Sequence, residues 1–302
     1  LCVAFYWDAL KVAPDRIVGG NDLSNMFYHW LSFTVAALRQ GEFPLWNPYL
    51  FAGLPFAANP QPALFYPTTW LVFAMPVTRA LSVAIVLHVW LAGVGMLAWL
   101  REEGCSLGAS LLGALTFAFG GYFFARVQAG HLGVIATGAW LPLLLALYRR
   151  SLTRRSYRLA LVGGLSVGLA LLAGHTASFF YVGLALAAYA GFRAWEAGRE
   201  VRAAHGPVRP LMTLGLMLGL GLAVAAVQLL PLAELAARSA RQAGASYEFA
   251  ARFPWPPGYL LTLLVPNFFG EPVRTGYWGE GVYDEVILYV CLLYTSPSPR
   301  DS

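Results

Sequence analysis

PLWNPYLFAGLPFAANPQPALFYP, from Pro44 to Pro67, is the stretch of sequence that decides how the chain is interpreted. Proline fixes φ and removes a hydrogen-bond donor, so a stretch this rich in Pro, Asn and Gly cannot be a helix. It also carries too many apolar and aromatic side chains for a free linker, because these need a surface to cover them. Long ordered loops tend to carry function. We therefore expect a packed loop, which either carries function or simply caps a helical bundle.

The composition indicates a membrane protein. The 302 residues are 58% hydrophobic and only 12% charged, with a mean hydropathy of +0.60, whereas soluble domains carry about 25% charged residues. The net charge of +5 comes from arginines in short loops between apolar runs, so it does not indicate a nucleic-acid partner. Cys2, Cys105 and Cys291 show neither metal-ligand spacing nor a disulfide framework. We expect an all-α polytopic membrane protein in contact with the lipid bilayer.

Several apolar runs approach the roughly 20 residues that a membrane-spanning helix needs. The expected spans are Thr78–Leu100, Ser106–Ala125, Leu132–Tyr148 and Leu211–Leu230, with two marginal shorter runs at Leu159–Ala173 and Thr176–Phe192. Outside them we expect an interfacial helix over Leu23–Leu38, a polar amphipathic segment over Leu232–Pro257, and an interfacial or re-entrant piece over Tyr259–Phe269. Glycine pairs at Gly164/Gly168 and Gly215/Gly219 predict close helix packing.

The arginines predict how the bundle is oriented. The loop Arg149–Arg158 holds five of them and the segment Arg193–Pro210 holds four. Cytoplasmic loops are enriched in Lys and Arg, so both segments are expected in the cytoplasm. Counting crossings from there places the long loop Asp8–Val77 outside.

Both ends of the sequence suggest a piece of a longer protein. The chain starts at Leu1 rather than Met, and CLLYTSPSPRDS, residues 291–302, resembles translated sequencing adapter. We expect residues 1–290 to form one transmembrane domain that is truncated at both ends, followed by a non-native tail.

One acidic residue has distinctive surroundings. Asp22 ends the motif GGND, Gly19–Asp22, and two glycines permit an unusual backbone beside a ligand. Alternatively, Asp22 caps the helix that begins at Leu23, and the residues alone favour this cap. Asp8 and Asp15 are weaker candidates in less specific surroundings.

Other polar residues gather at the predicted outer end of the bundle. Arg126, Gln128 and His131 form one cluster at an outer helix mouth, while His175 is alone at the other outer tip and His88 lies within a span. A lone histidine in a membrane is a functional candidate, but it often only bonds a neighbouring helix. Arg238 and Arg241 lie on a presumed surface helix with a Glu234–Arg238 pair, which either stabilises that helix or grips a lipid phosphate.

Taken together, the motifs resemble the YfhO-type family of bacterial membrane proteins, relatives of the GT-C glycosyltransferases. The resemblance runs through nearly all of the chain up to Val290, where the family continues with Gly and this chain has Cys291. It rests on GGND and on these blocks: GEFPLWNPYLFAGLPFAANPQPALFYP (Gly41–Pro67), GHLGVIATGAWLPLLL (Gly130–Leu145), QLLPLAELAARSAR (Gln228–Arg241), WPPGYLLTLLVPNFFG (Trp255–Gly270) and YDEVILYV (Tyr283–Val290).

The resemblance implies a GT-C-like bundle in the bacterial inner membrane that transfers a sugar from a polyprenyl-phosphate carrier to a cell-envelope polymer acceptor on the outer face. The family's carboxylate in the first outer loop matches Asp22 by position, with the role of general base. From residue type and side of the membrane, the substrate-binding candidates are Trp46, Asn47, Tyr49, Asn59, Gln61, Arg126, His131, Arg238 and Arg241. The sequence indicates no metal ligands and leaves the cofactor open, a divalent metal included.

Two rival functions stay open. The first is a transporter or flippase of lipid-linked precursors, against which stands the lack of an evident inverted repeat or paired broken helices. The second is a non-catalytic envelope-assembly scaffold, which the presence of Asp22 disfavours.

Overall fold

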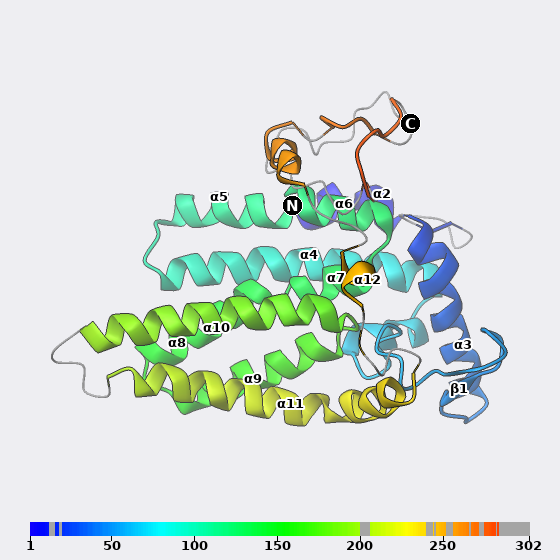
Figure 1. The fold of residues 1–302 in the computed structure, drawn as a ribbon, viewed down its shortest axis with the longest axis horizontal. Coiled ribbons are helices and arrows are strands. Elements are labelled where there is room, and N and C mark those ends of the chain that lie inside the picture. Colours follow the sequence, from blue (N-terminus) through cyan, green and yellow to red (C-terminus); the bar gives the residue numbers. More distant parts are fainter. Residues whose placement is uncertain are drawn as a thin grey trace.

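The computed structural model describes residues 1–11, 16–17, 20–199, 206–239, 244, 246–251, 256–265, 267–271, 275–281 and 283. Over these residues it is mostly helical, and five helical segments are long and apolar enough to cross a membrane (Figure 1). The prediction of an all-helical, multi-pass membrane protein is confirmed in this respect.

The spanning helices lie side by side along the long axis of the molecule (Figure 1). Their bounds are α4 (Val77–Glu102), α5 (Leu107–Ala118) followed by α6 (Gly121–Ala129), α7 (Leu132–Gly138) followed by α8 (Leu141–Thr153), α10 (Thr176–Arg199) and α11 (Val208–Ala237). A shorter apolar helix, α9 (Tyr157–Leu172), completes the bundle. Each strong span predicted from the sequence corresponds to one of these segments.

Two predictions about helix length are wrong. The run from Thr176 is not marginal, because α10 has 24 residues and continues to Arg199. The charged residue that would end it, Arg193, is neutralised by Glu103 and Glu196. Likewise, Leu232–Pro257 is not a separate surface segment from its start, since α11 continues through Pro231 as far as Ala237.

The short helix α9 packs closely on α11 through small residues. Added Cβ atoms at Gly164 and Gly168 would lie 2.9 Å from Leu220 and 2.7 Å from Val224, so only glycine permits this approach. The predicted packing role of this pair is confirmed. The same prediction is wrong for Gly215 and Gly219, which face open space. Gly221 occupies the α9–α11 interface instead.

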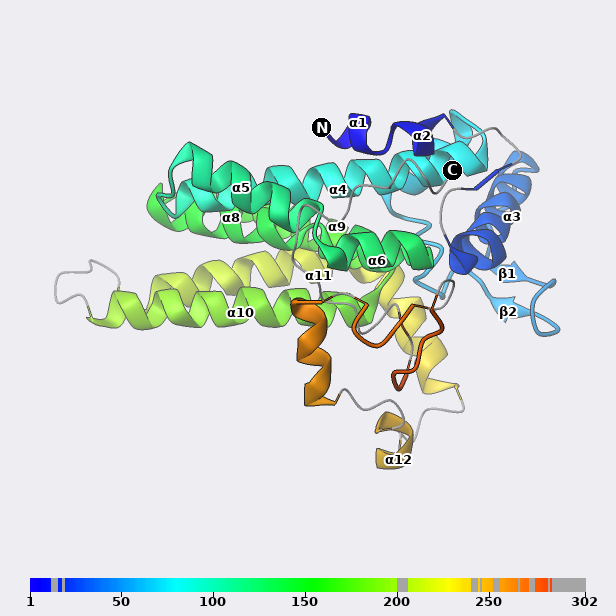
Figure 2. The ribbon, with the colours of Figure 1, turned by 90° about the horizontal axis from the view of Figure 1, so that it is seen from above.

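The first loop contains the predicted helix and lies across one end of the bundle. A π-helical turn (Leu23–Phe27) leads into α3 (Tyr28–Arg39), which runs across the bundle axis in both views (Figures 1 and 2). Before it, α1 (Cys2–Phe5) and α2 (Trp7–Leu10) contact α4. Beyond α11, the structure has α12 (Tyr247–Ala250) and a 3₁₀ helix (Pro257–Leu263).

The Pro44–Pro67 stretch is a non-helical loop, as predicted, but it is packed only in part. Phe56 and Tyr66 are buried, whereas Trp46, Tyr49 and Phe51 are 54%, 83% and 89% exposed. Strands β1 (Trp46–Asn47) and β2 (Leu54–Pro55) pair antiparallel, with Trp46 opposite Pro55, and a 3₁₀ helix (Pro67–Phe73) follows. Tyr66 fastens the loop to the bundle, because its hydroxyl lies 2.7 Å from His88 Nε2 and accepts a hydrogen bond from Trp140 Nε1 at 2.9 Å. His88 therefore bonds neighbouring elements, which is the structural alternative for an isolated membrane histidine.

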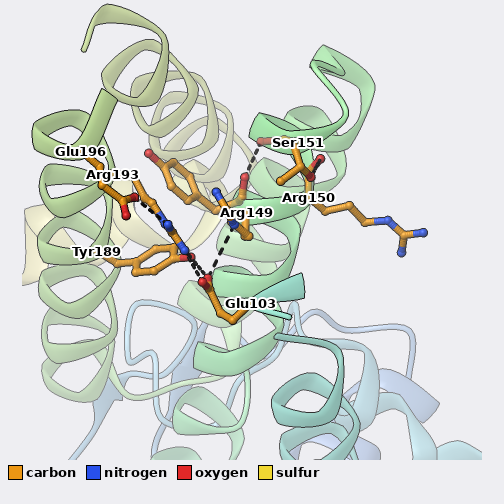
Figure 3. Close-up of polar contacts among 9 residues, drawn as sticks. Glu103, Arg149, Arg150, Ser151, Tyr189, Arg193 and Glu196 are labelled. Carbon is orange, nitrogen blue, oxygen red and sulfur yellow. Dashed lines mark hydrogen bonds and ion pairs between the residues drawn. The ribbon is translucent and has the colours of Figure 1, made fainter. Parts of the chain in front are cut away.

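The opposite end of the bundle is held by an ionic cluster (Figure 3). Glu103, just after α4, pairs with Arg193 and Tyr189 of α10 and lies 3.8 Å from Arg149 Nε of α8. Partial burial acts to raise the pKa of Glu103, but the hydrogen bonds from Arg193 and Tyr189 and the nearby arginine charges outweigh it, so the pKa is lowered. The arginine-rich loop after α8 therefore lies at the end remote from the first loop.

Candidate functional site

A polar cleft of about 520 Å³ lies at the end of the bundle that carries the first loop. Its walls come from the start of the first-loop helix, from α6 and α7, and from the start of α10. The polar and aromatic residues that line it are Asp22, Gln61, Tyr122, Arg126, His131, His175, Ser178 and Tyr181.

Two glycines bring Asp22 to this cleft. A Cβ atom on Gly20 would overlap the carbonyl oxygen of Gln128, in the last turn of α6. Gly130, directly after α6, has φ +84°, and its Cβ would lie 2.8 Å from the backbone nitrogen of Leu23. Glycine at both positions thus lets the loop backbone rest on the end of α6. The fully buried Leu23 then fixes the neighbouring Asp22 in place.

Asp22, His131 and Arg126 form a chain of polar contacts. Arg126 Nη1 donates to His131 Nδ1 at 3.1 Å, and His131 Nε2 lies 3.3 Å from Asp22 Oδ2. A guanidinium has only donors, so Nδ1 must be the acceptor and the neutral ring carries its proton on Nε2, beside the carboxylate. The Asp22 side chain remains 40% exposed and can still meet a ligand in the cleft.

The cap interpretation of Asp22 is wrong. Its backbone is already helical (φ −68°, ψ −35°), and its side chain makes no cap hydrogen bond. A capping residue normally has non-helical dihedral angles and accepts from a backbone N–H further along the helix. The Asp22 carboxylate is therefore directed to His131 and the cleft.

His175 adds a second imidazole to the same cleft. Its Nδ1 accepts a hydrogen bond from the backbone N–H of Ser178 at 3.1 Å, in the first turn of α10. Burial, with the positive charge of Arg126 nearby, lowers the pKa of His175, which favours a neutral ring with its proton on Nε2. The sequence showed His175 as isolated. Its place at the outer end between two spans was the signal that it could join the cluster.

Gln61 is the one polar first-loop candidate after Asp22 that reaches the cleft. Trp46, Asn47, Tyr49 and Asn59 are not among the lining residues. Asn47 is only 3% exposed, and its Oδ1 accepts from the backbone N–H of Tyr49 at 2.9 Å. Asn59 Oδ1 accepts in the same way from Gln61 N at 3.1 Å. Both amide oxygens thus stabilise turns.

Of the two candidate arginines near the C-terminal side, Arg238 is not among the residues that line the cleft. Arg238 directly follows α11 and pairs with Glu234 at 2.8 Å, so the predicted pair is confirmed. Its position on a separate surface helix is wrong, because Arg238 ends the extended α11. Arg241, Asp15, Gly19 and the tail 291–302 lie outside the described residues.

Within the described ranges, no group of three or more His, Cys, Asp or Glu residues is placed to hold a metal ion. The cleft offers one carboxylate, two imidazoles and one guanidinium. This set can accept a proton at Asp22 and can donate hydrogen bonds to an anion from Arg126 and His175.

No protein-family model, curated protein or solved structure matches this chain. The resemblance to the YfhO-type family stays a prediction from the sequence motifs.

Proposed function

We propose that the protein is a membrane glycosyltransferase that moves a sugar from a polyprenyl-phosphate carrier to an envelope polymer on the outer face of a bacterial inner membrane. The observation that carries this proposal is the contact of Asp22 with His131, 3.3 Å apart on the wall of a cleft that also contains Arg126. The site joins a carboxylate, as a base for an acceptor hydroxyl, to cationic and N–H groups, as partners for a phosphate.

In the proposed reaction, the acceptor hydroxyl attacks the anomeric carbon of the donor sugar. A bond forms from the acceptor oxygen to this carbon, and the bond from the carbon to the phosphate oxygen breaks. The electron pair leaves with polyprenyl phosphate, and the acceptor proton passes to the Asp22 carboxylate. A phosphate leaves readily as an anion, so one carboxylate is enough and no second carboxyl group is required as acid.

The neighbours of Asp22 suit this role. His131 Nε2–H orients the carboxylate, while Arg126 holds the imidazole by its hydrogen bond to Nδ1. Arg126 also brings a positive charge to the cleft, where it stabilises the leaving phosphate. Gln61 lines the same wall and is placed to bond a substrate hydroxyl.

The orientation supports an outer-face reaction. The cleft and the first loop lie at one end of the bundle, and the arginine-rich loop after α8 lies at the other. The positive-inside rule puts the arginine-rich end in the cytoplasm. The cleft then faces the side where envelope polymers are assembled.

The test measures bond transfer. Full-length protein in vesicles is supplied with a polyprenyl-phosphate sugar and an envelope polymer, and both transferred sugar and released polyprenyl phosphate are counted. Equal amounts of both support the proposal. Movement of the intact lipid-linked sugar across the bilayer without cleavage would instead identify a flippase.

A further inference from the structure

The imidazole of His175 has one hydrogen-bond donor left for a ligand. Its Nδ1 is occupied by the backbone N–H of Ser178, so the neutral ring carries its proton on Nε2. Over the described part of the chain, no side chain or carbonyl accepts from this nitrogen. The ring lines the cleft, so the Nε2–H group is available to a ligand there.

Arg126 supplies a second donor to the same cleft. Its Nη1 is bonded to His131, but its Nε is buried and has no hydrogen-bond partner among the described residues. A buried N–H without a partner is costly, so this group calls for an explanation, and a bound ligand or water is one. The guanidinium also lies over the Tyr122 ring, with 5.7 Å from Cζ to the ring centroid, which restricts its position.

We propose that His175 and Arg126 together form a phosphate-binding subsite in this cleft. Arg126 of α6 and His175 at the start of α10 line two walls of this one cleft, so both can reach a ligand bound in it. The Asp22 carboxylate, which lines the same cleft, is 3.3 Å from His131 Nε2. A neutral imidazole donor beside a fixed guanidinium suits a phosphate ester, which presents several acceptor oxygens to separate donors.

The inference rests on the proposed function only for the source of the phosphate, which would then belong to a lipid carrier. His175 is a new assignment because neither the sequence motifs nor the proposed base requires it. It contacts the ligand, whereas His131 acts through Asp22.

The test measures binding directly, with the full chain in phosphatidylcholine nanodiscs. The probes are farnesyl phosphate, farnesol as the same chain without phosphate, and inorganic phosphate. We expect wild-type protein to bind farnesyl phosphate more tightly than farnesol. His175→Asn keeps an acceptor for Ser178 N–H but loses the Nε2–H donor. It should therefore fold normally and lose about tenfold or more in affinity for farnesyl phosphate, as expected for one hydrogen bond to a charged group.

The control is His29→Asn, the same change at an exposed histidine of α3, which should leave all affinities unchanged. Unchanged farnesyl phosphate binding in His175→Asn, or equal binding of farnesol and farnesyl phosphate by wild type, would overturn the subsite. Inorganic phosphate binding as tightly as farnesyl phosphate, with the same His175 dependence, would support the subsite and count against a lipid carrier. Phosphate-dependent binding without sugar transfer would retain the subsite and reject the transferase.

Discussion

The side-chain amide of Gln228 in α11 donates to the carbonyl oxygens of Ala57 and Ala58 in the first loop, at 3.0 and 3.3 Å. These contacts join the last described spanning helix to the loop between β2 and the 3₁₀ helix. Gln228 is buried, so the amide and both carbonyls would lack partners without each other. Gln228 therefore fixes the loop that carries Gln61 to the cleft.

Gln228→Leu should lower the stability of the protein. The change leaves two loop carbonyls without their donor in an apolar site, at a cost of about 1–3 kcal/mol. Thermal unfolding in detergent measures the loss. Gln40→Leu, the same change at the exposed end of α3, is the control and should have little effect. Equal unfolding temperatures for Gln228→Leu and wild type would contradict the anchoring role.

Gly53→Ala should disrupt the β1–β2 hairpin. Gly53 has φ +118°, where other residues are strained, and an added Cβ would overlap the Trp46 ring. Strained backbone of this kind costs on the order of 1–3 kcal/mol. Gly108→Ala is a matched control, because it lies in α5 with open space around it and should be neutral or mildly stabilising. Comparison of the two unfolding temperatures checks the prediction, and a Gly53→Ala protein as stable as Gly108→Ala would refute it.

The lowered pKa of Glu103 predicts that the stability of the protein depends on pH. This pKa is lower in the folded protein than the ordinary value of about 4.3. The contacts of the ionised Glu103 therefore stabilise the folded protein fully above pH values near the ordinary pKa. This stabilisation is lost as the pH falls through the lower pKa of the folded state. The difference in unfolding temperature between wild type and Glu103→Gln should be largest near pH 7 and should narrow below about pH 4.

Glu234→Gln serves as the control for this measurement, since the Glu234–Arg238 pair is largely exposed and such pairs contribute little. Its difference from wild type should be small at every pH. A difference for Glu103→Gln that stays constant from pH 7 to pH 3 would show that the ion pair with Arg193 is not responsible.

The orientation is tested by cysteine labelling in intact cells, in a background without native cysteines. The hypothesis places Arg154 in the cytoplasm and the first loop outside. Asn47, the natural loop position from the sequence, is buried, so exposed Glu42 is the better probe. An impermeant reagent should label Glu42→Cys in intact cells and Arg154→Cys only after permeabilisation. The reverse labelling pattern would show that the bundle has the opposite orientation in the membrane.

Much of the fold was predictable because the apolar runs are long and their breaks are sharp. The absence of charge between Arg79 and Arg101 defines α4, and the density of Pro defines the first loop. The helix ends were harder. The length of α10 depends on the pairing of Arg193 with Glu103, which comes from a distant part of the sequence.

Part of the site was predictable from the positions of the same apolar runs. Counting crossings puts Asp22, Arg126 and His131 at one end of the bundle, and the structure brings them into contact. The sequence cannot tell which asparagine oxygens are used by turns, as at Asn47 and Asn59, because that depends on local backbone geometry. It also could not show that Gly20 rests on α6, which directs Asp22 to the cleft rather than to a cap.

Asp22→Asn is the decisive substitution for the proposed function. Asn keeps the shape of the side chain and a carbonyl oxygen for His131 Nε2–H, so folding and membrane insertion should survive. It cannot accept the acceptor proton, and loss of a general base typically costs about 10²–10⁴-fold in rate. Sugar transfer by the full-length variant should fall by this factor. Binding of farnesyl phosphate should persist, because the groups proposed to donate hydrogen bonds to the phosphate are Arg126 and His175.

Asp8→Asn makes the same chemical change in α2, outside the cleft, and should leave transfer unchanged. Near-wild-type transfer by Asp22→Asn would remove this residue from catalysis. It would move the search for the base to Asp15 or Asp8, or favour a non-catalytic scaffold.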